Sequence, residues 1–305
     1  MSSPPNVTSM IQTRGLTRRF GDLTAVDDVS FDVPRGLLTG FVGGNGAGKT
    51  TTMRMIMGLL GIDAGEVLWD GAPITAPVRR RFGYMPEERG LYPKQRVLDQ
   101  LVYLGELSGM PAGEARRSAQ EHLEHFGLAD RAGERVEKLS LGNQQRVQII
   151  AALMNEPLAL ILDEPFSGLD PTAVDSMADL LREETSRGTP VLFSSHQLDL
   201  VERLCDHLVV LAGGRVVAPG SVDGLTSRGP ERLRLVTDRD AGWVRDQRGL
   251  HVVDVAGPTA LVEVEDTDLA VVRRQLLTAA LERGEVVELA RVVTPLSEIY
   301  REVTA

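Results

Sequence analysis

The segment GGNGAGKTT, residues 43–51, constrains the fold of this 305-residue chain more than any other feature. It fits the phosphate-binding pattern G-x-x-x-x-G-K-[ST], and it lies between an apolar run at 37–42 and the helix-like run TTMRMIMGLL at 51–60. Glycines let the backbone bend tightly enough for consecutive N–H groups to surround a polyphosphate. The free N–H groups at the start of the following helix add the positive end of its dipole. We therefore predict a phosphate loop between a buried strand and a helix.

Each position of this loop has a predicted role. Lys49 supplies a positive charge for the β and γ phosphates, and the hydroxyl of Thr50 is a ligand for Mg²⁺. A glycine-rich turn without a ligand is the structural alternative. The residues expected to contact the nucleotide here are Gly43, Gly44, Asn45, Gly46, Ala47, Gly48, Lys49, Thr50 and Thr51.

Two adjacent carboxylates end a second apolar run, LALILDEP at 158–165. Carboxylates at the end of a buried strand cost free energy unless they have partners or a function. In a sheet that carries a phosphate loop, ligands bind at the carboxyl ends of the strands. We expect Asp163 to hold Mg²⁺, and Glu164 to orient and deprotonate the water that attacks the γ-phosphate. The alternative is an acidic turn without a function.

Two ring side chains are further candidates. His196 follows the apolar strand predicted in TPVLFSS, so it too lies at a strand's carboxyl end and can hydrogen-bond a terminal phosphate. Phe20 lies on the predicted turn Phe20-Gly21-Asp22, where its ring can stack on adenine. A single aromatic residue is more often part of the core, so the assignment of Phe20 depends on the other motifs.

Residues 96–137 are more polar than their surroundings and predict a helical insert. Within it, His122 and His125 are three residues apart, a spacing compatible with a metal site. No Cys or acidic partner completes such a site in the sequence, so we interpret these histidines as part of a solvated helix face.

Composition limits the class of protein. The length predicts about two domains, and the net charge of -10 argues against a nucleic-acid-binding surface. One cysteine excludes an internal disulfide framework and fits a reducing cytosol. The sequence contains no uninterrupted run of about 18 apolar residues, so we predict no membrane span. We also expect no signal peptide at the N-terminus. Any membrane role is then expected to come through a partner.

The residues after 230 predict a separate unit. They suggest a strand, a hairpin around Gly257-Pro258, a helix with an apolar stripe ending at Gly284, a last strand and a short helix. We predict a disordered tail at 1–10, a nucleotide-binding domain at 11–228 with a helical part at about 91–142, and an α+β domain at 229–305.

Together, these motifs resemble the ATP-binding subunit of an ABC transporter over residues 11–225. The resemblance implies an α/β fold, a P-loop NTPase core with an antiparallel β subdomain and a helical insert, plus the small C-terminal domain. Residues 43–51 resemble the Walker A loop, and 160–163 with Glu164 resemble the Walker B strand and catalytic base. Residues 167–170 resemble the D-loop, His196 the switch histidine, and Phe20 the aromatic that stacks on adenine.

A sixth motif, LSLGN at 139–143, resembles the LSGGQ signature, which in this family binds the γ-phosphate of ATP held by the opposite subunit. The resemblance adds Ser140, Gly142 and Asp170 to the ATP site. Leu141 and Asn143 depart from the usual Gly and Gln. Glu87 stands where the family usually has a Gln beside Mg²⁺ and the attacking water, so we count it as a catalytic residue and metal ligand. Since a carboxylate also repels phosphates, its effect on turnover stays open.

The resemblance implies an ATPase with ATP and Mg²⁺ as cofactors, acting as an ATP-dependent homodimer or pseudo-dimer on a separate transmembrane permease. We expect no nucleic-acid partner and a cytoplasmic location, peripheral on the inner face of the plasma membrane. The sequence of residues 139–170 resembles most closely that of exporter ATPases of the sodium- and drug-efflux type. A soluble non-transport ABC ATPase, a hydrolysis-poor nucleotide-gated regulator and an importer remain as alternatives.

Overall fold

The computed structural model describes residues 9–88, 90–227, 231–264 and 269–304, and the chain divides into two compact units after Val222. This division lies ahead of the predicted domain boundary between 228 and 229. Residues 1–8 of the predicted tail lie outside the described residues, while the first strand already begins at Ser9. Within the described residues, no helix is both long and apolar enough to cross a bilayer.

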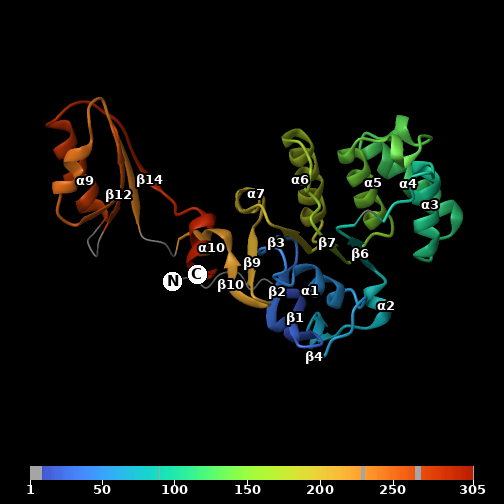
Figure 1. Cartoon of the computed structure of the whole chain (residues 1–305). Helices are drawn as coiled ribbons and strands as arrows, with labels where there is room; N and C mark the ends of the chain where they lie inside the picture. The colour runs from blue at the N-terminus through green and yellow to red at the C-terminus, as the bar shows by residue number, and fades with distance from the viewer. Residues whose placement is uncertain (1–8, 89, 228–230, 265–268, 305) are drawn as a thin grey trace. The chain divides into compact units, whose positions relative to one another are not determined.

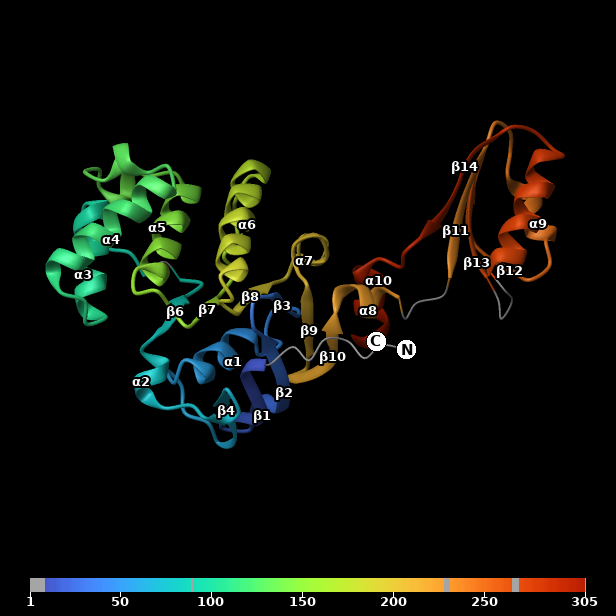
Figure 2. The same cartoon turned by 180° about the vertical axis from the view of Figure 1, so that it is seen from behind.

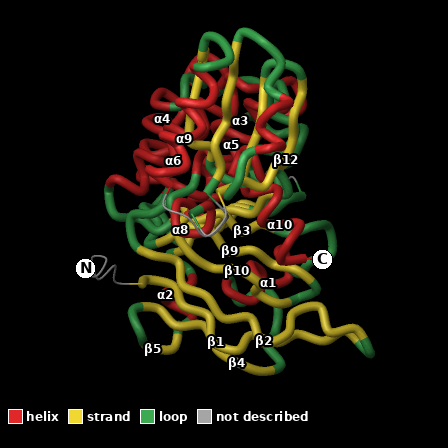
Figure 3. The backbone as a smooth tube through the Cα atoms, turned by 90° about the vertical axis from the view of Figure 1, so that its left-hand side faces the viewer, coloured by secondary structure: helices red, strands yellow, loops and turns green. Residues whose placement is uncertain are grey.

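The first unit contains an antiparallel sheet in the order β2-β1-β4-β5, seen as one layer of strands in Figure 3. Its strands are β1 (Ser9–Phe20), β2 (Leu23–Pro34), β4 (Ala64–Trp69) and β5 (Ala72–Pro73). The turn Asp70-Gly71 joins β4 to β5, and both of its residues have positive φ, 51° and 77°. Two residues of positive φ suit the right-handed twist of a two-residue hairpin.

A second sheet of the first unit carries the predicted strand ends. Its order is β10-β9-β3-β8-β7-β6, and all neighbouring strands are parallel except β10, which runs antiparallel to β9. The strands are β3 (Leu38–Val42), β6 (Phe82–Met85), β7 (Ala159–Leu162), β8 (Val191–Ser195), β9 (His207–Ala212) and β10 (Arg215–Ser221). Parallel strands end at the same edge, so the segments after β3, β6, β7 and β8 meet there.

The helix after the phosphate loop is shorter than predicted. We expect it at 51–60, but α1 spans Lys49–Ile56. The helix ends because Gly58 takes the left-handed conformation, φ +71°. The N–H groups of Leu59 and Leu60 then both bond to the carbonyl of Arg54, which closes the helix end.

Helix α1 packs between the two sheets of the first unit. Its residues Met53, Met55 and Ile56 are fully buried in a cluster that also contains Ile11 of β1 and Phe41 of β3. The cluster fixes the helix, and with it the phosphate loop, relative to the strand ends. Three other helices of this part are α2 (Ala76–Arg79), α6 (Pro171–Ser186) and α7 (Leu198–Leu204).

The predicted helical insert consists of α3 (Val97–Leu107), α4 (Ala112–His125) and α5 (Leu141–Leu153), with short 3-10 turns at Ala129–Arg131 and Val136–Lys138. Figure 1 shows these helices grouped beside α6. The insert continues past the expected end at 142, because the signature segment (residues 139–143) opens helix α5 instead of closing the insert.

The second unit is the predicted α+β domain. Its sheet has the order β12-β13-β11-β14 and is antiparallel throughout, and α9 covers one face, as Figure 2 shows. Buried Val272, Leu276 and Ala280 form the predicted stripe of this helix. The elements are α8 (Val222–Thr226), which spans the point of division, β11 (Arg232–Thr237), the 3-10 turn Gly242–Asp246, β12 (Leu250–Ala256), β13 (Thr259–Val264), α9 (Leu269–Leu281), β14 (Val286–Val292) and α10 (Leu296–Thr304).

Replacement of Leu235 by Ala should destabilise the second unit. Leu235 is fully buried in its core, so the truncation leaves a cavity and costs about 2–5 kcal/mol. Hydrogen exchange of the β11 amides measures this loss locally. The matched control is Leu277→Ala on α9, which is 37% exposed. Equal protection of β11 in the two variants would contradict the assignment of Leu235 to the core.

Candidate functional site

The phosphate loop (residues 43–51) depends on glycine at three positions. Gly46 and Gly48 have φ values of +77° and +102°, which other residues rarely adopt. A Cβ atom on Gly43 would lie 2.5 Å from the carbonyl oxygen of Leu211, and one on Gly48 would lie 2.6 Å from that of Ala25. The glycines therefore serve both the turn and the close packing of the loop on its neighbours.

Lys49 lies along the inside of this loop. Its Nζ donates to the carbonyl oxygens of Gly43 at 2.7 Å and Gly44 at 3.2 Å, and the residue is 8% exposed. Gly44, Asn45 and Gly46 form the exposed tip. The loop thus surrounds a cation and opens directly into the N-terminus of α1, an arrangement that suits a polyphosphate.

Asp163 directly follows β7 and is 1% exposed. Its Oδ1 accepts a hydrogen bond from Ser194 Oγ at 2.6 Å, whereas Oδ2 is buried without a partner among the described residues. A buried carboxylate oxygen without a partner is costly unless another group binds it. Because carboxylates are hard ligands, this oxygen fits the predicted Mg²⁺, and a hydroxyl such as that of Thr50 is also of the right type.

Glu164 is held from the neighbouring strand β8. Its N–H donates to Ser194 Oγ at 2.8 Å, and its Oε2 lies 3.0 Å from Nδ1 of His196, so the ring can donate to the carboxylate. Burial raises the pKa of Glu164 above its ordinary value, whereas His196 and the charge of Lys49 act in the opposite direction. A partly buried carboxylate with a raised pKa and an imidazole partner has the properties of a general base.

Ser194 is the residue that sequence reasoning missed. Its hydroxyl contacts both acidic residues: it donates to Asp163 and accepts from the N–H of Glu164. The signal available in the sequence is a pair of serines that ends the strand VLFSS after three apolar residues, and Ser194 is fully buried in the structure. Only the pairing of β7 with β8 shows what this serine binds.

The signature segment and the D-loop (residues 167–170) each start a helix. Ser140 caps α5, with Oγ accepting from the N–H of Asn143 at 3.4 Å. Asp170 caps α6, with Oδ1 accepting from the N–H of Ala173 at 2.9 Å, and Pro171 is the first helical residue. The two caps are exposed, so Ser140, Gly142 and Asp170 remain predicted ATP contacts at the surface.

The structure places Phe20 and Glu87 on the surface. Phe20 is 47% exposed at the end of β1, and the Arg18 guanidinium lies 5.0 Å from its ring centroid. It is therefore not part of the core. Glu87 is exposed in the loop after β6. Burial raises the pKa of Tyr84 on β6, and the nearby carboxylate of Asp163 raises it further.

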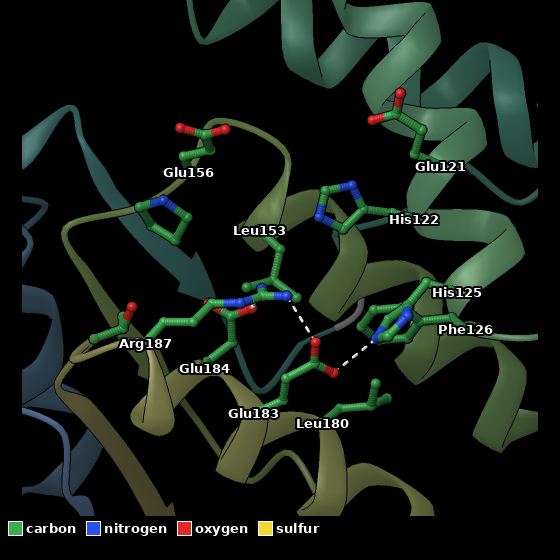
Figure 4. A pocket seen from close by; sticks show the side chains of 12 residues that line it. Glu121, His122, His125, Phe126, Leu153, Glu156, Leu180, Glu183, Glu184 and Arg187 are labelled. Atoms are coloured by element: carbon green, nitrogen blue, oxygen red, sulfur yellow. Dashed lines mark hydrogen bonds and ion pairs between the residues drawn. The ribbon is translucent and has the colours of Figure 1, made fainter.

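His122 and His125 of the helical insert line a separate pocket, which contains none of the candidate site residues at the strand ends. Figure 4 shows them in a pocket of about 490 Å³ between α4 and α6. His125 Nε2 lies 2.9 Å from Glu183 Oε2, and His122 Nδ1 lies 2.8 Å from the carbonyl oxygen of Ser118. In the described ranges, no group of three or more His, Cys, Asp and Glu side chains could hold a metal ion.

Comparison with known proteins identifies the family. Residues 26–167 match the family described as ABC transporter. The chain is 43% identical to the uncharacterized ABC transporter ATP-binding protein YhaQ of Bacillus subtilis over 242 residues, 79% of this chain and 81% of that relative. The chain belongs to the ATP-binding proteins of ABC transporters. It is accordingly an ATPase subunit that binds ATP, and the predicted fold is confirmed.

Export-related proteins are among its relatives. The linearmycin resistance ATP-binding protein LnrL of Bacillus subtilis is 36% identical over 72% of this chain and 71% of the relative. The Nod factor export ATP-binding protein I of Burkholderia lata is 38% identical over 70% of this chain and 72% of the relative. The predicted sodium- and drug-efflux subgroup is finer than what these comparisons show.

Solved structures share the fold. One described as the ATP binding subunit of an ABC transporter has a TM-score of 0.65 and 33% identity, covering 72% of this chain and 93% of that one. The cbiO1 protein of Clostridium perfringens, described as part of the ABC transporter complex cbiONQ, has a TM-score of 0.65 and 27% identity, covering 72% and 91%.

Replacement of Glu164 by Gln should stabilise the fold at high pH. Because the folded-state pKa of Glu164 is raised, the free energy of unfolding falls as pH rises from the unfolded-state pKa through the folded-state pKa. Gln does not ionise and escapes this loss. Thermal denaturation without nucleotide and metal should show a higher Tm for the variant at about pH 8 and little difference at about pH 4, near the ordinary Glu pKa.

The control is Glu124→Gln, which neutralises an exposed glutamate of α4. It should leave the pH dependence of Tm close to that of the wild type. If the Tm of the wild type exceeds that of Glu164→Gln at high pH, the interaction of the Glu164 carboxylate with His196 stabilises the fold by more than burial of that carboxylate costs.

Proposed function

We propose that this chain is the ATP-hydrolysing subunit of an ABC exporter, which closes as a dimer around two ATP molecules and drives a permease on a separate chain. The observation that carries the proposal is the meeting of the phosphate loop, Asp163, Glu164 and His196 at one edge of the parallel sheet. The phosphate loop follows β3 and the two carboxylates follow β7. His196 follows β8, which pairs with both of these strands, and lies 3.0 Å from Glu164.

The residues divide the reaction between them. Lys49, which lies against the carbonyls of the loop, would pair with the phosphates when ATP enters. Glu164 would orient the attacking water and take its proton, since its raised pKa favours the protonated product. His196 would hold the Glu164 carboxylate in place and, being half exposed, can reach the terminal phosphate.

Mg²⁺ would be held by Asp163 through the oxygen that has no partner among the described residues, together with Thr50 and Glu87. When bound, such an ion neutralises charge on the β and γ phosphates. Ser194 would keep Asp163 oriented toward this site, because its hydrogen bond occupies the other carboxylate oxygen.

Exposure of both halves of the site supports the dimer. The tip of the phosphate loop, Ser140 of the signature segment and Asp170 of the D-loop are exposed in the single chain. A second copy of the chain would cover the loop of one subunit with the signature segment of the other. Each ATP would thus lie in a composite site, which we define as one built from two subunits.

The relatives support export as the direction. Two of them carry names that refer to Nod factor export and linearmycin resistance. Ion or drug efflux is therefore the proposed class of transport. The chain would act at the cytoplasmic face of the plasma membrane, bound through its permease.

A pocket of about 300 Å³ is the proposed docking place for that permease. It lies between β6, α3 and α5, with Leu104 and Leu107 on one side and Phe82 at the strand. Gln148 lines it, is 5% exposed, and has a buried Nε2 without a partner in the described part of the chain. Such a pocket can accept a short apolar segment that offers one hydrogen-bond acceptor.

Replacement of Glu164 by Gln should slow ATP hydrolysis by about 10²–10⁴-fold, the usual contribution of a general base. ATP binding should persist, and the variant should accumulate as an ATP-dependent dimer. Steady-state hydrolysis and light scattering with Mg²⁺ and ATP measure the two effects. Hydrolysis at the wild-type rate would exclude Glu164 as the base, and a monomer at saturating ATP would contradict the composite sites.

Replacement of Leu107 by Asp should weaken membrane recruitment at least about tenfold, because it places a charge among the apolar side chains of the docking pocket. Flotation with inverted plasma-membrane vesicles from the source organism measures binding. Protein-free liposomes provide the background. Leu59→Asp is the matched control, since Leu59 is 63% and Leu107 is 66% exposed. Equal losses in both variants would show that this pocket is not the docking place.

A further inference from the structure

Tyr84 of β6 carries a polar group to which the proposed reaction assigns no role. Its half-buried side chain packs against the core cluster that contains Met53 of α1 and Phe82 of β6. The hydroxyl oxygen itself is buried and has no hydrogen-bond partner among the described residues. A buried hydroxyl without a partner costs free energy, so its presence in the core requires an explanation.

The register of two strands brings this hydroxyl to the acidic end of β7. Tyr84 pairs with Ile161 of β7, and the ladder continues to Asp163, whose N–H donates to the carbonyl oxygen of Met85 at 2.8 Å. Because side chains alternate between the two faces of a strand, Tyr84, Ile161 and Asp163 share one face. The pKa of Tyr84 agrees with this placement, since burial raises it and the carboxylate of Asp163 raises it further.

Tyr84 and Asp163 offer complementary groups that do not bond to each other. Within the described part of the chain, the hydroxyl of Tyr84 is a buried donor without an acceptor, and Oδ2 of Asp163 is a buried acceptor without a donor. Arg54 of α1 lowers the pKa of Tyr84, but its guanidinium can only donate and cannot accept the hydroxyl proton. A water molecule between the two groups would satisfy both of them.

We propose that Tyr84 is a positioning residue of the cation site: its hydroxyl holds a water molecule against Asp163 Oδ2, where a cation bound to that oxygen keeps part of its water shell. Mg²⁺ retains several water molecules when a protein binds it. A hydroxyl rotates and can both donate and accept, so Tyr84 can hold this water before and after the cation enters. This inference rests on the proposed assignment of Asp163 to Mg²⁺.

Tyr84→Phe removes the hydroxyl and keeps the ring. The probe is a non-hydrolysable ATP analogue, whose affinity is measured by isothermal titration calorimetry in excess Mg²⁺ and again in EDTA. Affinity in Mg²⁺ should fall about tenfold, the lower end of the usual effect of groups that orient a metal ligand. Affinity in EDTA and the Tm of the nucleotide-free protein should stay near the wild-type values, because the hydroxyl bonds to no described residue.

The matched control is Tyr103→Phe, the same change at a tyrosine of α3 that is 41% exposed. It should leave the affinity for the analogue unchanged in both solutions. If Tyr84→Phe does not fold, Tyr84→Met also lacks the hydroxyl and should show the same selective loss in Mg²⁺. Equal losses of affinity in Mg²⁺ and in EDTA, or an unchanged affinity in Mg²⁺, would overturn the role of Tyr84.

The cation site itself is tested separately through Asp163→Asn in the same assay. Mg²⁺ should no longer raise the affinity of this variant for the analogue. If Asp163→Asn keeps the wild-type gain from Mg²⁺, the proposed metal site is refuted, and the inference about Tyr84 with it. If Asp163→Asn loses that gain while Tyr84→Phe keeps the wild-type affinity in Mg²⁺, only the inference about Tyr84 is refuted.

Discussion

The site depends on holding two adjacent carboxylates at the end of a strand that is buried along its whole length. Asp163 and Glu164 would repel each other and lose hydration there, so their charge requires specific partners. The hydroxyl of Ser194 supplies one bond to each residue, to the Asp163 side chain and to the Glu164 backbone. One oxygen of Asp163 stays without a partner among the described residues, and the site's capacity for a cation rests on this oxygen.

The order of the strands decides which groups compensate these carboxylates. Strand β8 lies between β3 and β7, so the polar end of β8 meets the phosphate loop on one side and the acidic pair on the other. His196 is placed against Glu164 by this neighbourhood. A different order would separate the same motifs, although each would still be intact in the sequence.

The backbone is strained at Glu164, one of these two carboxylates. Glu164 adopts the left-handed conformation at a cost of about 1–3 kcal/mol for a residue that is not glycine. The hydrogen bonds with Ser194 and His196 at the end of β8 offset part of this cost. The backbone and the carboxylate of Glu164 are therefore both positioned by residues of one neighbouring strand end.

The sequence by itself determined the features that depend on neighbouring residues, namely the phosphate loop and the apolar strands. These follow from local backbone and hydrogen-bond preferences, which a short segment already contains. Only the tertiary structure decided the role of Ser194 and the surface position of Phe20. Ser194 binds groups more than 20 residues away, and strand order sets those pairings.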